Sequence, residues 1–562
     1  MKKALSVILS FCLVFVLFSV CSSASEELKL TVSADTHFQC DGDLADMGNS
    51  ADDIPFCDGM LNRETYFYSS VQGQMNYESE AIFRAMLSDF VNGDSKYLLI
   101  AGDITCGKRL SHTKAAELLK QAEDISGKSV FVINGNHDCD DNDFDKYISV
   151  DEFKEIYKDL GYDKALSTEP TSASYSADLD GKYRLLAIDS CIYGKDNGQI
   201  TENVFNWIKE QVELAKKDNK TLIAMMHHSI LPHFEVQPMF TGYAKYAEFF
   251  ADNGIKLVFT GHVHANDISS STTKGGNTIY DVQTGSLIVS PNAYRVVSLS
   301  GGNADITSNY ITKIDTGYLP QGYPEEQMKL IENDFAGYSY GYYESGICKW
   351  LNRYIGSAYK VSRLLKIEEG TAAYNALDGV MKKIGSSLLL DIYSNGENKS
   401  LEDIAQKGGY SLPESDYEKP YQVAARVMYG FYHGDENTVS SDSDFDLLLL
   451  IFKAAVTDIL ATETEIASTE LASEILGINV SEELLTSALG FNYSDAMADI
   501  IAKSLLQTVA GGIKDDFSTP GDINVTINLS GSDAAAPVLN LFMKIISLIT
   551  EFLERFAEIL VG

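Results

Sequence analysis

Five short apolar runs in the first half of the chain each end in a polar segment rich in Asp, Asn or His. One of them, Val130 to Ile133, is followed directly by Asn134-Gly135-Asn136-His137-Asp138. Apolar runs of this length that stop abruptly are typical of buried strands, and open α/β sheets place their ligand sites beyond the carboxyl ends of the strands. Since imidazole nitrogens and carboxylate oxygens bind borderline metals, the pattern predicts a metal site at the edge of an α/β sheet. The other four runs and their polar ends are Leu28 to Ser33 with Asp35-Thr36-His37, Leu98 to Ala101 with Gly102-Asp103, Leu222 to Met226 with His227-His228, and Lys256 to Thr260 with Gly261-His262-Val263-His264.

In this order the polar segments resemble the five motifs of the calcineurin-like metallophosphoesterase superfamily, over roughly residues 28 to 315. The resemblance implies an α/β fold, a four-layer αββα sandwich, and a cofactor of two divalent or trivalent metal ions, drawn from Mn, Fe and Zn. The alternation of helical and strand patterns between the motifs also favours an α/β sheet. The metal ligands that the resemblance implies are Asp35, His37 and His264 for one ion, Asn136, His227 and His262 for the other, and Asp103 as the bridging carboxylate.

Three further residues of the motifs are candidates for catalysis. By its place in the motif, His137 faces the substrate, where it stabilises the transition state or protonates the leaving group, and Asp138 accepts its other N–H. The alternative for Asp138 is a cap of the next helix. His228, the second histidine of its pair, is either a pocket residue or a donor behind a metal ligand. His112 and His233 are expected at the surface or at helix starts, with the pocket rim as the alternative for His233.

A narrower resemblance is to exported members of the superfamily that are similar to cyclic-nucleotide phosphodiesterases and carry a helical C-terminal domain. It implies hydrolysis of a phosphodiester, with a cyclic nucleotide or a phosphomonoester as open alternatives. Cys106 stands where purple acid phosphatases have a metal-binding tyrosine, which disfavours an iron–tyrosinate site. The rival hypothesis is a cell-surface binding protein with a vestigial metal site. The stretches that carry the resemblance are Leu98 to Asp103, Ser111-His112, Val130 to Asp138, Phe153 to Tyr157 with Gly161-Tyr162, and Met226 to His228.

The charge of the chain limits its partners. The formal net charge is −36 at pH 7, and a surface of this sign repels a phosphate backbone. We therefore expect a small phosphate ester as substrate and no nucleic-acid polymer as partner.

The N-terminus has the pattern of a secretory signal, with Lys2-Lys3, an apolar stretch to Cys21, and small residues after it. We expect residues 1–24 to be removed and the protein to be secreted or otherwise extracytoplasmic. Lipidation of Cys21 and an uncleaved membrane anchor are the alternatives. Export permits a disulfide between Cys40 and Cys57, for which the alternative is two free or buried thiols.

The proline- and glycine-containing segment Thr316 to Pro324 predicts a domain boundary. We expect a metallophosphoesterase domain over residues 25–318 and a mostly helical domain over residues 325–562. The tyrosine-rich run Ala336 to Tyr343 is expected either to pack at the domain interface or to stack on a substrate. The amphipathic segment Val538 to Val561 is expected to pack in a core or on a partner protein, with membrane-surface attachment as the alternative.

Overall fold

The computed structural model describes residues 27–44, 73–140, 147–234, 237–358, 362, 368–396, 399–434, 443–462 and 521–529. The predicted signal segment, Cys57 and the predicted helix at Val538 to Val561 lie outside these residues. No helix in the described ranges combines the length and apolar character needed to cross a bilayer.

The first sheet has six strands in the order β13-β12-β11-β1-β2-β3. β1, β2 and β3 run parallel, so their carboxyl ends meet at one edge, whereas β11, β12 and β13 continue the sheet in antiparallel pairs. All but the first residue of β2 and of β3 is buried, as expected for strands covered on both faces. The bounds are β1 (Leu28–Ser33), β2 (Tyr97–Ala101), β3 (Ser129–Ile133), β11 (Ala293–Ser300), β12 (Asn303–Tyr310) and β13 (Asn524–Asn528).

The second sheet has seven strands in the order β4-β5-β6-β7-β8-β10-β9. β6, β7, β8 and β10 run parallel to one another, so the ends of β7 and β8 also meet at one edge. The bounds are β4 (Ser167–Thr168), β5 (Tyr175–Asp178), β6 (Tyr183–Ile188), β7 (Thr221–Met226), β8 (Leu257–Thr260), β9 (Asp267–Thr272) and β10 (Thr278–Gln283).

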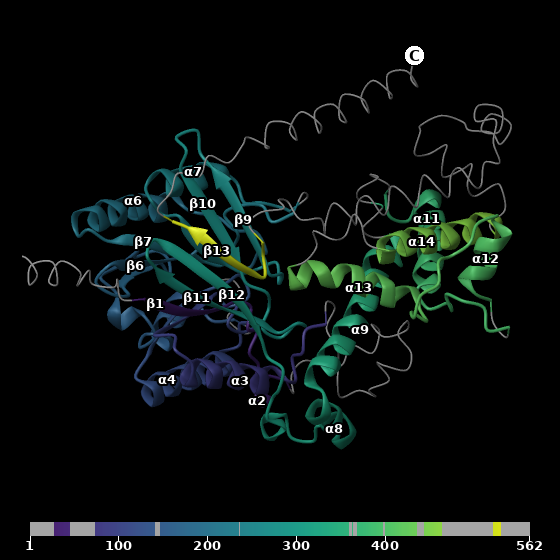
Figure 1. The fold of residues 1–562 in the computed structure, drawn as a ribbon, viewed down its shortest axis with the longest axis horizontal. Coiled ribbons are helices and arrows are strands. Elements are labelled where there is room, and N and C mark those ends of the chain that lie inside the picture. The colour runs from purple at the N-terminus through teal and green to yellow at the C-terminus, as the bar shows by residue number, and fades with distance from the viewer. Residues whose placement is uncertain are drawn as a thin grey trace, which may run out of the picture.

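Helices cover the outer face of each sheet, which makes four layers (Figure 1). α3 (Ser79–Asn92) and α4 (Arg109–Ser126) lie on the first sheet, and α6 (Glu202–Lys217) and α7 (Tyr243–Asp252) lie on the second. Apolar side chains of both sheets form one continuous core between them. The predicted αββα sandwich is therefore confirmed. Shorter helices in this part are α2 (Asp41–Leu44), α5 (Val150–Ile156), η2 (Tyr162–Lys164) and η3 (Thr316–Tyr318).

The region after the predicted boundary is helical in the described residues and packs beside the sandwich (Figure 1). Its core includes Ala265 and Val289 of the sandwich, and the ring of Phe431 lies 5.5 Å from that of Phe234. Tyr338, Tyr342 and Tyr343 are buried here, so the tyrosine-rich run packs at the interface. The bounds are α8 (Glu325–Asn333), α9 (Phe335–Ile355), α11 (Ala372–Ser387), α12 (Leu401–Lys407), α13 (Pro420–His433) and α14 (Ser443–Thr462).

Two segments differ from the predicted pattern. Residues 524–528 fall in the predicted helical domain but form β13, which pairs with β12 at the edge of the first sheet. The β-rich residues of Ser286 to Val289 predict a strand, but they form a turn, and Ser286 Oγ donates to the carbonyl of Asp35 in the loop after β1 at 2.8 Å.

Cys40 carries a free thiol, so of the two alternatives for this residue the disulfide with Cys57 is excluded and the buried thiol is observed. Its sulfur is buried 3.6 Å from Ser111 Oγ and 3.9 Å from Asp43 Oδ2. Cys348 of α9, in contrast, is disulfide-bonded.

Candidate metal centre

Backbone hydrogen bonds join the loop after β1 to the loop after β2, and the loop after β7 to the loop after β8. Asp35 N donates to Gly102 O at 3.1 Å, and His37 N donates to Asp103 O at 3.0 Å. Gly261 N donates to His227 O at 3.0 Å. Each of these bonds joins the ends of two neighbouring strands of one sheet. Across the two sheets, His262 N donates to Asp35 Oδ2 at 2.9 Å and His227 Nδ1 lies 2.9 Å from the carbonyl of Ala101, so the polar motifs of both sheets face one space.

One group of side chains gathers around Asp35. The Nε2 atoms of His37 and His264 lie 3.2 Å apart. Asp35 Oδ1 lies 3.4 Å from His264 Nε2 and 3.9 Å from His37 Nε2. All three residues are buried, and their donor atoms are close enough together to share one ion.

A second group gathers around Asn136. Its Oδ1 lies 3.0 Å from His227 Nε2 and 3.0 Å from His262 Nδ1. Asp103 Oδ2 lies 3.2 Å from His227 Nε2 and 3.9 Å from His37 Nε2, between the two groups, as a bridging ligand requires. Asp35 Oδ1 is also 4.0 Å from His227 Nε2, so the two carboxylates lie side by side at the centre.

The backbone at these positions is unusual. Among the described residues, seven that are not glycine have a positive φ, and five of the seven belong to this site. Residues other than glycine rarely adopt a positive φ, because the conformation is strained. Strained backbone of this kind clusters at functional sites. The five residues are Asp35 (φ 47°), His37 (38°), Asp103 (48°), His262 (76°) and His264 (69°).

Two glycines allow the loops to approach the ligands. A Cβ at Gly135 would lie 2.1 Å from Asp103 Oδ1 and 2.3 Å from Asp103 N. A Cβ at Gly261 would lie 2.3 Å from Asp35 Oδ2. Such contacts are too short for any side chain, so the Gly-Asn-His and Gly-His motifs need glycine for close approach.

The electrostatics of the site fit a pair of cations. Asp35 Oδ1 is buried and has no hydrogen-bond partner among the described residues, which is costly for a carboxylate unless a cation compensates it. Burial lowers the pKa of His37 to about 3, so this ring is neutral, as a metal ligand must be. Burial also opposes charge on His227, but the Asp103 and Asp35 carboxylates raise its pKa to about 10. The negative charge of the site is therefore centred on the Asp103 and Asp35 carboxylates, which attract a positive charge to the space between the two groups.

The structure assigns Asp138 a different contact from the one predicted. Its buried carboxylate accepts hydrogen bonds from the backbone N–H groups of Gly135 (2.8 Å), Thr105 (2.9 Å) and Ile104 (3.2 Å). Among the described residues, no hydrogen bond joins it to the His137 ring. The prediction that Asp138 orients His137 is wrong in this respect, because the carboxylate turns back toward the loop after β2. It fixes that loop against the Gly135-Asn136 turn.

His137 is held by its backbone and open at its side chain. Its N–H donates to Asp103 Oδ1 at 2.8 Å, and its exposed ring lies 5.4 Å from the ring of His37. His228 is buried, with Nδ1 2.9 Å from Ser190 Oγ and Nε2 3.2 Å from the carbonyl of Asp196. Since both of its nitrogens have partners, His228 lies behind the ligands, packed 4.5 Å from the ring of His262.

Of the two histidines expected at the surface or at helix starts, His112 lies in the first turn of α4, and both are buried. His112 lies between Tyr157 Oη (2.9 Å) and Thr105 Oγ1 (2.8 Å), under the Asp103 loop. His233 lies between Asp267 and Asp281. Neither follows a strand in the motif pattern, so no local signal marked them.

Cys106 lies behind His37, with its sulfur 3.7 Å from Nδ1 of that ring. It therefore contacts the face of His37 turned away from the metal position.

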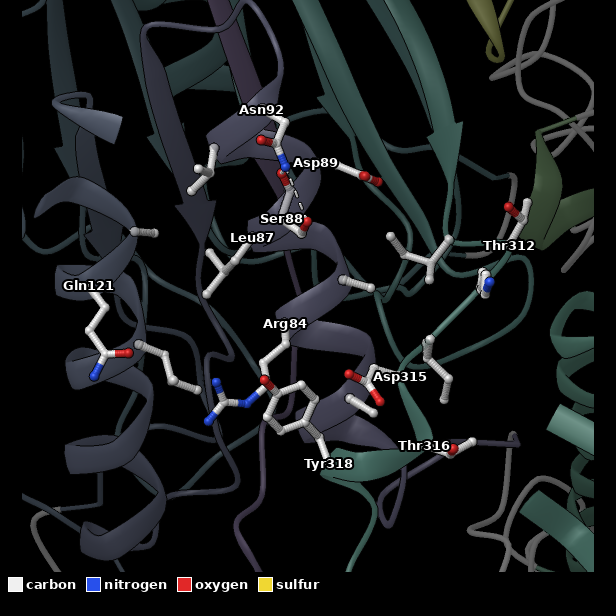
Figure 2. A pocket seen from close by; sticks show the side chains of 18 of the residues that line it. Arg84, Leu87, Ser88, Asp89, Asn92, Gln121, Thr312, Asp315, Thr316 and Tyr318 are labelled. Atoms are coloured by element: carbon white, nitrogen blue, oxygen red, sulfur yellow. Dashed lines mark hydrogen bonds between the residues drawn. The ribbon is translucent and has the colours of Figure 1, made fainter. Parts of the chain in front are cut away.

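A cavity of about 920 Å³ lies elsewhere, between α3, α4 and the segment after β12 (Figure 2). Arg84 within it pairs with Glu80 at 2.7 Å and lies over the ring of Tyr318 at 4.3 Å. None of the seven predicted ligands lines this cavity.

Comparison with known proteins agrees with the geometry. Residues 28–266 match the family model described as calcineurin-like phosphoesterase. This segment is a calcineurin-like phosphoesterase domain. It contains all seven predicted ligands, and the family uses a dinuclear metal centre.

Two curated relatives of the calcineurin-like phosphoesterase domain are named as phosphodiesterases. A probable cyclic nucleotide phosphodiesterase of Psychrobacter arcticus is 28% identical over 205 residues, which cover 35% of this chain and 66% of the relative. Glycerophosphodiester phosphodiesterase GpdQ of Enterobacter lignolyticus is 27% identical over 180 residues, which cover 30% of this chain and 55% of the relative. Both alignments thus leave about a third or more of the relative unmatched. A dimetal phosphatase from Danio rerio aligns with 50% of this chain and 96% of its own, at 13% identity and a TM-score of 0.35.

Proposed function

We propose that the protein is a phosphodiesterase that hydrolyses a small phosphodiester at a dinuclear metal centre. The observation that carries the proposal is the meeting of two ligand groups at Asp103, whose Oδ2 lies between His227 and His37. One group would hold an ion through Asp35, His37 and His264. The other would hold an ion through Asn136, His227 and His262. When bound, the two cations supply positive charge to the phosphate oxygens and make a water acidic enough to attack near neutral pH.

The residues of the chain provide orientation and a proton donor. Asp103 is fixed by the His137 N–H on its Oδ1, which leaves Oδ2 directed between the two groups. Asp138 holds the loops that carry Asp103 and Asn136 at a constant distance. The exposed imidazole of His137 is placed to donate a proton to the leaving oxygen.

The substrate class follows from charge and from the relatives. Both curated relatives are named for diesters, one cyclic and one a glycerophosphodiester. The net charge of −36 disfavours a polymeric phosphate. We therefore propose a small diester, with a 3′,5′-cyclic nucleotide as one candidate and phosphomonoesters as weaker substrates.

The proposed location is outside the cytoplasm. Disulfides persist mainly in oxidising compartments, and the bonded Cys348 supports the secretory pattern at the N-terminus. We also propose that the segment Val538 to Val561 contacts a partner protein or a membrane surface.

The test compares turnover of bis-p-nitrophenyl phosphate, p-nitrophenyl phosphate and cyclic nucleotides by purified protein supplied with Mn²⁺ or Zn²⁺. We predict that Asp103→Asn lowers kcat for the diester by about 10²–10³-fold or more, since one charged group at the reacting centre is lost. Asp94→Asn serves as the matched control, because that carboxylate is exposed on the surface and pairs with Lys29. An Asp103→Asn protein as active as the control would contradict the role of Asp103 as the bridging ligand. A folded, metal-loaded protein that turns over none of these esters would instead favour the binding-protein hypothesis.

A further inference from the structure

Five ionisable side chains form a fully buried cluster behind the loop that carries His264. They come from β11, from the loop after β7, from β9 and β10, and from the residue two positions before β13. Their exposed fractions are between 0% and 3%. Charges this deep require compensation by one another or by hydrogen bonds. The five residues are Arg295, His233, Asp267, Asp281 and Asp522.

Arg295 links the cluster to residues 521–529, which we call the C-terminal segment. Its guanidinium donates to the carbonyl of Gln283 at 2.8 and 3.1 Å and to the carbonyl of Asp522 at 2.6 Å. It also donates to Ser308 Oγ at 3.1 Å and reaches the carbonyl of Asp267 at 3.5 Å. Arg295 thereby ties β10, β9 and β12 to a residue more than two hundred positions further along the chain.

Asp522 holds the start of β9. Its Oδ1 accepts the N–H of Ile268 at 2.8 Å. The next residue, Ile523, accepts the N–H of Ser308 at 3.0 Å, and β13 then pairs with β12. In Figure 1 this strand is the yellow arrow that lies beside β12. The C-terminal segment is therefore built into the sandwich rather than into the helical region.

Ile268 is four residues after His264, and the residues between them are each fixed. The carbonyl of Ala265 accepts from Gln283 Nε2 at 3.1 Å. Asn266 accepts from Gly285 N at 2.9 Å and donates its own N–H to the carbonyl of Tyr432 in α13 at 3.3 Å. Asp267 Oδ1 lies 2.6 Å from His233 Nδ1. His264 itself has a φ of 69°, a conformation that must be maintained by its surroundings.

We propose that Asp522 is a positioning residue of the metal centre: by holding Ile268 it fixes the turn at His264 and so the ion site of Asp35, His37 and His264. The inference rests on the proposed dinuclear centre. It makes the C-terminal segment a required part of the calcineurin-like phosphoesterase domain, although it lies far outside residues 28–266. Asp522 contacts none of the seven ligands and acts through the backbone alone.

The test is metal titration of chelator-treated full-length protein by calorimetry, using Mn²⁺ and then Zn²⁺. For Asp522→Ala we expect binding of the ion of Asp35, His37 and His264 to weaken by about 10-fold, the low end of the range for losing a direct partner of a metal ligand, because Asp522 acts through the backbone. Asp522→Asn keeps the oxygen that accepts from Ile268 and is expected to bind both ions nearly as wild type does. The matched control is Asp305→Ala, which removes a contact to Thr526 on the exposed face of the same strand pair.

The outcomes separate positioning from general stability. If Asp522→Ala and Asp305→Ala lower the Tm alike and both bind two ions as wild type does, the inference is overturned while the proposed function stands. Wild type that binds fewer than two ions overturns the proposed function and the inference together. Should Asp522→Ala fail to fold, Asp522→Glu displaces the carboxylate by one methylene while keeping its charge. Weakened binding of one ion by that variant supports the inference, and unchanged binding overturns it.

Discussion

His137 combines a fixed backbone with an open side chain, and this separates its role from that of the ligands. We predict that His137→Gln lowers kcat by about 10²–10⁴-fold, the range of general acid–base catalysis, while the protein still binds two ions. The loss should be larger for an alkyl diester than for bis-p-nitrophenyl phosphate, because nitrophenolate leaves without protonation. Steady-state rates on both substrates check this. An equal loss on the two esters would argue against proton donation by His137.

His233 gives a pH-dependent contribution to stability. Burial lowers its pKa, but the Asp267 and Asp281 carboxylates outweigh burial and raise the pKa well above its usual value. A raised pKa in the folded state means that the stabilisation is complete below about pH 6.5, declines as the pH rises, and is lost above the folded-state pKa. We predict that the difference in Tm between wild type and His233→Gln is largest below pH 6.5 and shrinks toward alkaline pH. A difference that grows with pH would show that His233 is neutral in the fold.

The seven candidate ligand positions could be proposed from sequence because each lies shortly after an apolar run and the order of the motifs resembles that of the calcineurin-like superfamily. The contacts of Asp138, His112 and His233 could not, because their partners other than Gly135 are between 7 and 48 positions away in the chain. Whether an isolated histidine is buried depends on which distant carboxylate or hydroxyl the fold brings to it. Sequence also places Asp138 beside its neighbour His137, because the backbone of Thr105 that it binds lies 33 positions earlier in the chain.

Among the elements, α9 joins the helical region to the sandwich through a buried carboxylate. Glu78, which precedes α3, accepts from Tyr323 Oη at 2.5 Å and from Tyr338 Oη at 3.0 Å. We predict that Tyr338→Phe lowers the free energy of unfolding by about 1–3 kcal/mol, since a buried acceptor loses a donor. Tyr340→Phe on the same helix is the control, because no hydroxyl bond of Tyr340 is present in the described residues. Denaturant unfolding of both variants measures the difference, and equal stabilities would contradict the role of the Glu78 contact.

Helices with a clear apolar stripe were predictable to within a few residues. The helical spacing of the apolar residues between Glu78 and Val91 predicts a helix, and Ser79–Asn92 is observed. β13 was not predictable, because a five-residue strand that follows predicted helices has no local partner and exists only through its pairing with β12. Its alternation of exposed and buried residues becomes informative only once the edge of the first sheet is known.

At the scale of the whole molecule, the loops that carry the candidate ligands contact the two sheets as well as later parts of the chain. Residues 27–318 supply every strand of the two sheets except β13, while α9, α13 and residues 521–529 pack against the segment that follows His264. Near residue 318 the described elements change from a mixture of strands and helices to helices, and residues 524–528 then return to the first sheet. The sequence located the change of pattern but contained no local sign that the chain returns to the first sheet.

The central claim is that seven side chains from five strand ends bind two ions and that both ions are needed for diester hydrolysis. The most direct measurement titrates Mn²⁺ into chelator-treated protein and records bound metal and bis-p-nitrophenyl phosphate turnover in the same samples. We predict no turnover without metal, two ions bound per chain at saturation, and turnover that rises as the second ion binds. Full turnover by the metal-free protein, or two bound ions without any turnover, would contradict the claim.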